Sequence, residues 1–348
     1  MKIMSIIGAR PQMIKAAAVS RVLRTQHQEI LVHTGQHYDK NMSDVFFEQL
    51  NIPKPDYHLA VGSGSHGLQT GSMMIEIEKL CMRERPDAVM VYGDTNSTLA
   101  GGITASKLLI PVVHVEAGLR SFNMSMPEEQ NRILTDHIST LLFAPTRTAV
   151  TNLKRENITK GVYNTGDVMY DAVLHFQEMV PTDTLERLQV TTPYVLATIH
   201  RAENTDNPKN LKNIFDAFAA YGKKIVLPLH PRTQKFVKQY NIQMSRNVQV
   251  LSPVGYLDML ALEMCADKIA TDSGGVQKEA YFLEKPCITM RSETEWVETV
   301  ADRWNVIVGN SPEKICAAIE EFVPSGYRSD VFGNGTAAEK ICTLLKSI

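Results

Sequence analysis

The chain has 348 residues, of which 44% are hydrophobic and 21% charged, and its formal net charge is -2. This length favours two domains, because single hydrophobic cores rarely grow beyond about 250–300 residues. The near-neutral charge excludes a general attraction to nucleic acid or anionic membranes, and no window is apolar for the roughly 20 residues that a membrane helix needs.

The first residues, MKIMSIIGARP, are expected to form a strand and not a signal peptide, because Arg10 and Pro11 interrupt a short apolar run. The five cysteines are scattered and none stands in CxxC spacing: Cys81, Cys265, Cys287, Cys316 and Cys342. An odd number without paired spacing favours a reducing cytoplasmic compartment and argues against disulfides and zinc.

Short apolar runs then alternate with amphipathic segments along the chain. The runs in the first half are KIMSIIG, EILVHTG, DAVMVYGD, PVVHVEAG and LLFAPT, and those in the second half are YVLATIH, KKIVLPLH, VQVLSP, KIATDSGG, PCITMR and WNVIVG. Runs that are apolar on both faces predict parallel sheets covered by helices. We therefore expect an α/β protein with two doubly wound, Rossmann-like domains, residues 1–175 and 190–348, joined within 175–193. The last helix, GTAAEKICTLLKSI, could pack on either domain.

Polar residues and glycines gather where the predicted strands end, as in GAR, GQH, GDT, EAG, HR, HP and DSG. In open parallel sheets, ligands bind at the carboxyl edge of the strands. We expect the two domains to point this edge at one another, so that the ligand site is the cleft between them.

The segment GARPQMIK follows the first strand. Pro11 suits the first turn of a helix, and Arg10 and Lys15 would lie near the helix N-terminus, whose N–H groups and dipole favour anions. These two cations are expected to hold a diphosphate. An ordinary surface turn is the alternative, because the spacing alone is weakly specific.

Acidic residues follow later strands of the first half: Asp94 in GDTNST, Glu116 in HVEAGLRS and Glu128 in MPEEQNR, close to Arg132. Each alone is also typical of a helix cap or a helix first turn, and Glu129 is assigned to such ordinary helix-start chemistry. Acids that meet at one sheet edge raise each other's pKa and supply general acid–base groups. Calcium-loop spacing is absent, so no metal is expected.

In the second half, HRAEN places His200 and Arg201 at the end of a strand, where they would form an anion-facing pair. For His230 in LPLHPRT, a ligand contact and a turn position are equally compatible with the sequence, because a proline follows it. These positions extend the expected anion site into the second domain.

The stretch TDSGGVQKEA turns from a strand directly into a helix. The missing side chains of Gly274 and Gly275 would let a phosphate reach the helix N–H groups, and Ser273 adds a hydroxyl. Glu279, about one turn further on, could accept hydrogen bonds from the hydroxyls of a ribose. The alternative is a tight turn with a capped helix.

Together these blocks, with GDVMYDA and RSETEW, resemble the non-hydrolysing UDP-N-acetylglucosamine 2-epimerase family over nearly the whole chain. The resemblance implies a GT-B fold, a cytoplasmic homodimer and no nicotinamide or metal cofactor. It also implies a reaction in which the sugar C2 proton is lost as UDP leaves C1. UDP then adds back to the resulting 2-acetamidoglucal, with a proton on the other face of C2, and the product supplies surface polysaccharide synthesis.

The same resemblance implies roles for individual residues. Those implied in catalysis are Asp94, Glu116, Glu128 and His200. Those implied in binding the UDP-sugar are Arg10, Lys15, Arg132, His230, Ser273, Gly274, Gly275 and Glu279.

Departures from the family pattern concern substrate and regulation. The chain reads Gln36-His37-Tyr38 where the family often has Gln-His-Arg, so the arginine of an activator site is absent. The segment between Glu116 and Glu128 looks shorter than in the UDP-N-acetylglucosamine enzymes.

GARPQMIK and ETEWVE look more like the branch that acts on UDP-2,3-diacetamido-2,3-dideoxyglucuronate. Its extra carboxylate needs a cation, for which Arg120 and Arg147 are candidates by position. A hydrolysing epimerase, a GT-B glycosyltransferase and a non-catalytic sugar-nucleotide sensor remain the alternative functions.

Overall fold

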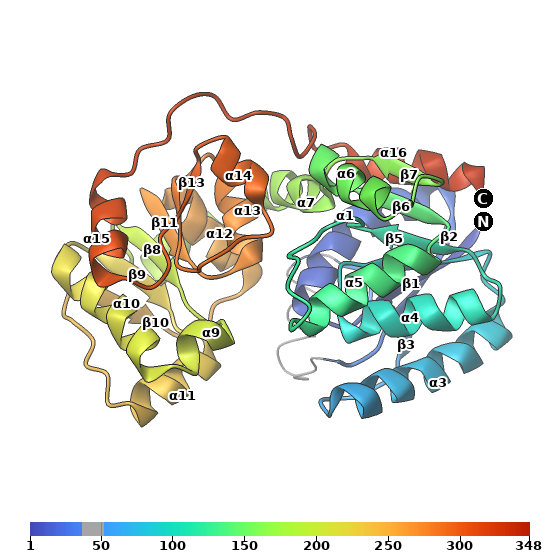
Figure 1. Ribbon diagram of the computed structural model, residues 1–348, viewed down its shortest axis with the longest axis horizontal. Helices are drawn as coiled ribbons and strands as arrows, with labels where there is room; N and C mark the ends of the chain where they lie inside the picture. Colours follow the sequence, from blue (N-terminus) through green and yellow to red (C-terminus); the bar gives the residue numbers. More distant parts are fainter. Residues whose placement is uncertain (37–49, 51) are drawn as a thin grey trace. The chain divides into compact units, whose positions relative to one another are not determined.

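The computed structural model describes residues 1–36, 50 and 52–348. These residues form two compact units, Met1–His175 with Asp330–Ile348, and Phe176–Ser329 (Figure 1). His37 and Tyr38, on which the activator-site prediction depends, lie outside the described residues. In the described part of the chain, no helix combines the length and the apolar character needed to cross a membrane.

In the first unit, the described strands form a parallel sheet in the order β3-β2-β1-β4-β5-β6-β7. The strands are β1 (Lys2–Ile7), β2 (Gln28–His33), β3 (Tyr57–His58), β4 (Ala88–Tyr92), β5 (Val112–Val115), β6 (Leu141–Ala144) and β7 (Val162–Asn164). The helices are α1 (Arg10–Gln26), α3 (His66–Glu84), α4 (Asn96–Lys107), α5 (Pro127–Ile138), α6 (Arg147–Arg155), α7 (Val168–Gln177) and α16 (Ala337–Leu344).

This sheet is buried on both faces, as the apolar runs predicted. Side chains of α3 and α4, such as Ile77 and Ala100, pack against Met4, Ile6 and Val89 on one face. Figure 1 shows α1 and α16 together on the other face. The strand order reverses at β1, so the carboxyl ends of β1 and β4 lie beside the switch point where ligands bind in such sheets.

The last helix packs on the first unit, which settles a question that the sequence left open. The backbone N–H groups of Ala337 and Ala338, at the start of α16, donate to the carboxylate of Asp171 in α7 (3.1 and 2.8 Å). The N–H of Asp167 donates to the carbonyl of Phe332 (2.9 Å). The motif GDVMYDA thus holds the returning end of the chain, and an acid at a helix N-terminus is favourable.

The described strands of the second unit form a parallel sheet in the order β10-β9-β8-β11-β12-β13. The strands are β8 (Val195–Thr198), β9 (Ile225–Pro228), β10 (Val248–Leu251), β11 (Lys268–Thr271), β12 (Cys287–Thr289) and β13 (Asn305–Ile307). The helices are α8 (Thr184–Arg187), α9 (Ala202–Thr205), α10 (Pro208–Tyr221), α11 (Pro231–Gln239), α12 (Tyr256–Cys265), α13 (Gly274–Phe282), α14 (Val297–Ala301) and α15 (Pro312–Glu321).

Alternate residues of β8 enter different cores in this unit. Val195 and Ala197 pack with α10 and α15, whereas Leu196 packs with Leu262 of α12 and Val276 of α13. The predicted α/β class with two doubly wound parallel sheets is therefore confirmed. The order places the carboxyl ends of β8 and β11 side by side, which brings HRAEN next to TDSGG.

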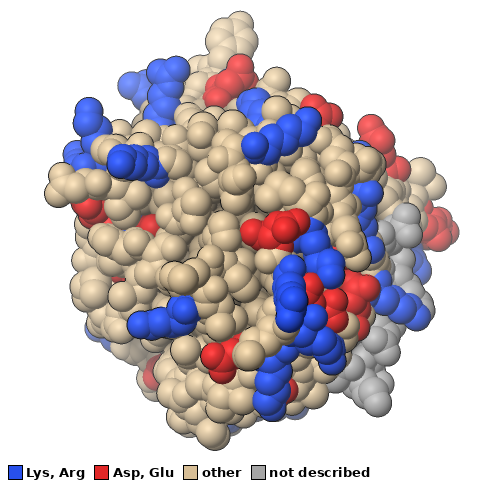
Figure 2. Space-filling view, turned by 90° about the vertical axis from the view of Figure 1, so that its right-hand side faces the viewer, with Lys and Arg blue, Asp and Glu red and all other residues tan. Residues whose placement is uncertain are grey.

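Charged side chains of both signs are mixed over the face of the molecule in Figure 2, with broad uncharged areas between them. This distribution agrees with the formal net charge of -2. A mixed surface gives no extended cationic field on this face that would attract a polyanion.

Candidate functional site

Two of the predicted acids stand at adjacent strand ends of the first unit. Asp94 follows β4 through Gly93 (φ 63°), and Glu116 follows β5 with a left-handed backbone (φ 73°). A Cβ on Gly93 would lie 3.2 Å from a carboxylate oxygen of Glu116 and 3.5 Å from Nζ of Lys15. Glycine therefore suits position 93 on two grounds, the positive φ and the close approach of these side chains.

Lys15 of α1 forms an ion pair with Glu116. Both side chains are largely buried, with 12% and 6% of their surface exposed. The pairing links GARPQMIK to HVEAGLRS, which the sequence could not show. Arg10, the other cation of the first motif, is half-buried at the start of α1.

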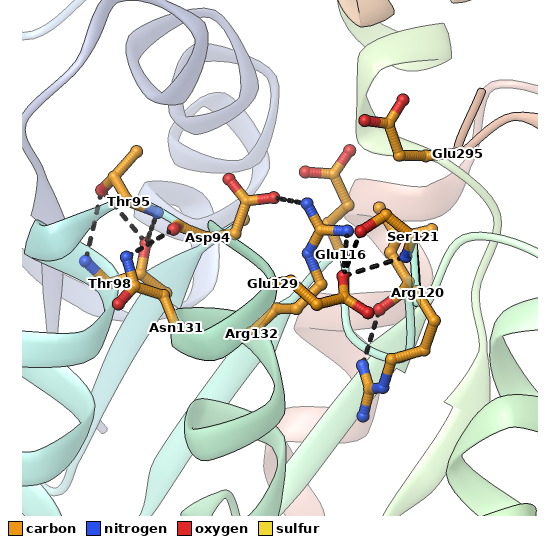
Figure 3. Close-up of polar contacts among 12 residues, drawn as sticks. Asp94, Thr95, Thr98, Glu116, Arg120, Ser121, Glu129, Asn131, Arg132 and Glu295 are labelled. Carbon is orange, nitrogen blue, oxygen red and sulfur yellow. Dashed lines mark hydrogen bonds and ion pairs between the residues drawn. The ribbon is translucent and has the colours of Figure 1, made fainter. Parts of the chain in front are cut away.

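Asp94 is held by Arg132 of α5, which also donates to Glu129 (Nη1 to Oε2, 2.9 Å; Figure 3). The amide of Asn131 donates to the carbonyl of Asp94 (3.0 Å). Arg132 was predicted to contact the substrate, and the structure places it between two carboxylates. The guanidinium neutralises part of their charge and fixes the direction of Asp94.

Glu129 has a larger part than the helix-start role expected for it. It is 1% exposed, and its carboxylate accepts hydrogen bonds from the backbone N–H groups of Ser121 and Phe122 and from the Ser121 hydroxyl (2.9, 2.8 and 3.0 Å). Glu129 does stand in the first turn of α5, as expected, and its carboxylate also ties the loop after Glu116 to this helix. Glu128 is half-buried and makes no hydrogen bond or ion pair with any described residue.

Arg120 does not serve as a cation for a substrate carboxylate. Its side chain is 1% exposed. It donates to Glu156 from Nε and Nη2, to Asp136 from Nη1 (each 2.7 Å), and to the carbonyl of Leu119 (2.6 Å). The prediction for Arg120 is therefore wrong, because neighbouring acids already use this guanidinium. Arg147, the other candidate, is exposed at the first position of α6.

In the second unit, Asp272 organises the end of β8, a residue that the sequence reasoning did not assign. Its buried carboxylate accepts from the backbone N–H groups of His200 and Arg201 (3.0 Å each) and from the amide of Asn204 (3.1 Å). An acid at the end of β11 was the available signal, but its partners are about seventy residues away.

His200 and His230 lie together, with ring centroids 5.6 Å apart. The pKa of His200 is lowered, chiefly by burial and further by the positive charges of Arg201, His230 and Arg232, against the opposing effect of Asp272. A neutral imidazole is therefore expected at pH 7. His230 is exposed, and its Nδ1 accepts from the N–H of Arg232 as the N-cap of α11.

Ser273 caps α13, and its hydroxyl accepts from the N–H of Val276 (3.5 Å). A Cβ on Gly274 would meet Trp296 Nε1 at 3.3 Å, Glu295 Oε2 at 3.7 Å and Arg201 Nη2 at 3.8 Å. Arg201 and the acid Glu295 thus both lie at the N-terminus of this helix, whose N–H groups favour an anion. Gly275 is exposed, and a Cβ there would meet only the Ser273 hydroxyl, at 3.8 Å.

Glu279 of α13 faces Glu263 of α12, another residue that the sequence reasoning missed. Both are buried, with 5% and 1% of their surface exposed. The pKa of Glu263 is raised well above its ordinary value by burial, by the negative charge of Glu279 and by their mutual hydrogen bond. Glu263 therefore keeps its proton to a higher pH than an ordinary glutamate does. Its only signal in the sequence was an acid within the apolar helix YLDMLALEMC.

The structure thus gathers the predicted residues into two groups. In the first unit, Lys15, Asp94, Glu116 and Arg132 meet at the ends of β4 and β5. In the second unit, His200, His230, Ser273 and Gly274 stand at the ends of β8, β9 and β11. Over the described residues, no group of three or more His, Cys, Asp or Glu is arranged to hold a metal ion.

Comparison with known proteins gives the family of this chain. Residues 21–346 match the family described as UDP-N-acetylglucosamine 2-epimerase. A Methanococcus maripaludis protein named as a homolog of that enzyme is 52% identical, and the UDP-2,3-diacetamido-2,3-dideoxy-D-glucuronate 2-epimerase of Pseudomonas aeruginosa is 49% identical, each match covering 100% of both chains.

A solved structure agrees with these sequence matches. The Methanocaldococcus jannaschii UDP-GlcNAc 2-epimerase, in complex with UDP-GlcNAc and UDP, superposes with a TM-score of 0.93 at 45% identity, over 100% of both chains. The two parallel-sheet units are accordingly those of a GT-B-type fold. The predicted resemblance is confirmed, and this chain belongs to the UDP-N-acetylglucosamine 2-epimerase family, a family of isomerases.

Proposed function

We propose that this protein is a non-hydrolysing UDP-sugar 2-epimerase. It interconverts UDP-N-acetylglucosamine and UDP-N-acetylmannosamine, or their 2,3-diacetamido-2,3-dideoxyuronic acid analogues. One relative is named for UDP-N-acetylglucosamine (46% identity) and another for the diacetamido uronate (49% identity), each over nearly the whole chain. Both support the reaction class, and both substrates stay in the proposal. The reaction needs acid–base groups around the sugar ring, and the acids at the ends of β4 and β5 are the observation that carries the proposal.

In the proposed mechanism, a base removes the proton from C2 while the bond between C1 and the diphosphate oxygen breaks. The electrons of the C2–H bond form the C1–C2 double bond of a 2-acetamidoglucal, and UDP leaves with the electrons of the C1–O bond. In the return step, UDP attacks C1 and an acid delivers a proton to the opposite face of C2. Asp94, Glu116 and Glu128 are the groups assigned to these proton transfers.

Each assigned acid has a distinct setting in the structure. Asp94 pairs with Arg132 and Glu116 with Lys15, so these two carboxylates have a cation beside them. Glu128 lacks such a partner among the described residues. Acids in different electrostatic settings suit a reaction that needs one group to accept a proton and another to donate one.

UDP is assigned to the second unit. The start of α13, with Ser273, Gly274 and Arg201, offers helix N–H groups and a cation for the diphosphate. His200 contacts the departing UDP, and Arg10 of the first unit stays a predicted diphosphate contact. Glu279 accepts hydrogen bonds from the hydroxyls of the ribose. The protein is further proposed to act in the cytoplasm, in the synthesis of activated sugars for surface polysaccharides.

A homodimer is also proposed, and α3 provides the face that supports it. Leu68, Ile75 and Met82 are 69%, 56% and 67% exposed and stand seven residues apart, on one side of the helix. An apolar stripe on one helix can pair with the same stripe of a second copy across a two-fold axis.

NMR of both UDP-sugars in deuterated water tests the proposed reaction. We expect the C2 epimer to accumulate, with deuterium at C2 and without added NAD or metal. Retention of the original C2 hydrogen would contradict the elimination. Accumulation of free UDP and free sugar indicates the hydrolysing reaction, and no change until an acceptor is added indicates a glycosyltransferase.

A further inference from the structure

A buried histidine lies behind the two acid-bearing strand ends of the first unit. His114 belongs to β5, and its side chain is fully buried. Its Nδ1 is 2.7 Å from Oδ1 of Asp136, and its Nε2 is 2.7 Å from the carbonyl oxygen of Gly93. The mechanism proposed above assigns this ring no part.

Both ring nitrogens of His114 face groups that accept hydrogen bonds. A backbone carbonyl oxygen only accepts, so Nε2 must carry a proton to bind Gly93. Independently of His114, Oδ2 of Asp136 accepts from the guanidinium of Arg120 (2.7 Å) and from the N–H of Gly118 (3.1 Å), which are the partners of an ionised carboxylate. An ionised carboxylate also only accepts, so Nδ1 must carry a proton too. A ring with both protons is an imidazolium.

The charges around His114 are consistent with a cation. Asp136 faces it from α5, and Arg120 lies on the other side of Asp136. Arg120 is shared with Glu156, which follows α6 and has the exposed His137 at 3.9 Å. One guanidinium between two carboxylates leaves a negative charge, and an imidazolium at His114 balances it.

The same contacts reach both candidate acids. Gly93 directly precedes Asp94, so the hydrogen bond from Nε2 fixes the turn that carries this acid. Asp136 also accepts from the N–H of Gly118 (3.1 Å), two residues after Glu116. One buried ion pair therefore holds the backbone beside both acids.

We propose that His114 is a positioning residue, held as an imidazolium, that fixes Asp94 and Glu116 relative to each other through Gly93 and Asp136. Its effect on the reaction rests on the proposed function. If Nδ1 or Nε2 loses its proton, a ring lone pair faces the oxygen of Asp136 or of Gly93, and that hydrogen bond is lost. The backbone beside Glu116 or Asp94 is then no longer held in place. Misplacement of a reacting group by about 1 Å can cost about 10²-fold in rate.

Nitrogen-15 NMR of the histidine rings at pH 7 tests the protonation state without any substrate. We expect both nitrogens of His114 to be protonated, with the signals assigned by their loss in His114→Gln. His33 is the internal control, because it is equally buried, its Nδ1 accepts from the N–H of Gly35, and burial and His58 lower its pKa to about 4. A neutral His114 ring in the folded protein overturns the proposed imidazolium.

Kinetics of His114→Gln test the positioning role. We expect kcat to fall about 10–100-fold and KM to change less than about 3-fold, since the substrate contacts are kept. His58→Gln, an exposed histidine of β3, is the control and should keep both constants. A folded His114→Gln protein with the wild-type kcat overturns the positioning role.

Asp136→Asn provides a second variant if His114→Gln does not fold. Its amide offers no carboxylate to Nδ1, so we expect a neutral His114 ring and a similar loss of kcat. An unchanged kcat with a neutral ring again overturns the proposal. A wild-type protein that converts neither UDP-sugar overturns the proposed function and the kinetic role of His114 together, while the NMR result decides the ring state separately.

Discussion

At the scale of single residues, the candidate acids differ in what holds them. Asp94, Glu116 and Glu129 each have a cation within ion-pairing distance, but Glu129 also binds the loop that starts at Ser121. A group that touches the reacting sugar and a group that holds a loop should respond differently to loss of charge. Replacing each acid by its amide separates these two roles.

We expect Asp94→Asn, Glu116→Gln and Glu128→Gln each to lower kcat by about 10²–10⁴-fold, the usual contribution of general acid–base groups, with smaller changes in KM. Stopped NMR assays of C2 epimerisation would measure both constants. Glu321→Gln, an exposed acid at the end of α15, is the control for the loss of one charge. An Asp94→Asn, Glu116→Gln or Glu128→Gln variant that keeps the wild-type kcat removes that acid from the mechanism.

The buried pair Glu263–Glu279 makes stability depend on pH. The pKa of Glu263 is raised by burial and by Glu279, above the ordinary value of about 4.3 that applies in the unfolded chain. The folded protein therefore binds the extra proton, and the free energy of unfolding should fall as pH rises from about 4.3 towards the folded pKa. Glu263→Gln cannot lose a proton and can still donate to Glu279, so its stability should change less over this range.

Thermal unfolding between pH 5 and pH 8 would measure this difference. Both tryptophans of the chain, Trp296 and Trp304, lie in the second unit, so their fluorescence reports the unfolding of the unit that holds the pair. Parallel pH dependences in the wild type and in Glu263→Gln would show that folding does not raise the pKa of Glu263.

At the scale of elements, α3 buries one side against the sheet and exposes an apolar stripe on another. Met73 and Ile77 are fully buried, whereas Leu68, Ile75 and Met82 are exposed. The buried side explains why the segment folds as a helix on this sheet. The exposed stripe is not buried within a single chain, and in the proposed homodimer it would be buried against a second copy.

We expect Ile75→Glu to convert the dimer into a monomer, because it places a charge at the centre of the stripe in each copy. Light scattering after size-exclusion chromatography would give the mass. The substitution lies on the surface, so the circular dichroism spectrum should keep its wild-type shape. Val323→Glu, also at an exposed apolar residue, is the matched control and should remain dimeric. A dimeric Ile75→Glu protein would exclude α3 as the interface.

At the scale of the whole molecule, the open property is substrate choice, because the relatives are named for two different substrates. The P. aeruginosa relative at 49% identity is named for the uronate substrate, and the M. jannaschii relative at 46% for UDP-N-acetylglucosamine. The uronate carries an additional carboxylate, which a site would have to pair with a cation. Because Arg120 is used internally, Arg147 at the start of α6 is the remaining candidate.

We expect the diacetamido uronate to be converted with a higher kcat/KM than UDP-N-acetylglucosamine, and Arg147→Ala to reduce this preference by removing the cation. The two conversions would be followed by NMR under identical conditions. Arg155→Ala, at the other end of the same helix, is the control because it removes an equally exposed arginine. Equal turnover of both substrates by the wild-type protein would contradict the uronate preference.

The sequence by itself determined the α/β class, the two sheets and the strand ends at which Asp94, Glu116, His200 and Ser273 stand. These features depend on local periodicity and on residues next to one another in the sequence, so they can be predicted without knowing the tertiary structure. The order of the motifs also determined the family.

Only the tertiary structure decided which charges pair. Arg120 is used by Asp136 and Glu156, Lys15 neutralises Glu116, and burial together with the charge of Glu279 raises the pKa of Glu263. These partners lie between 16 and 101 positions apart where they form ion pairs, and no local pattern brings them together. The charge of a buried group depends on the atoms within a few ångströms of it, and chain folding alone determines which atoms those are.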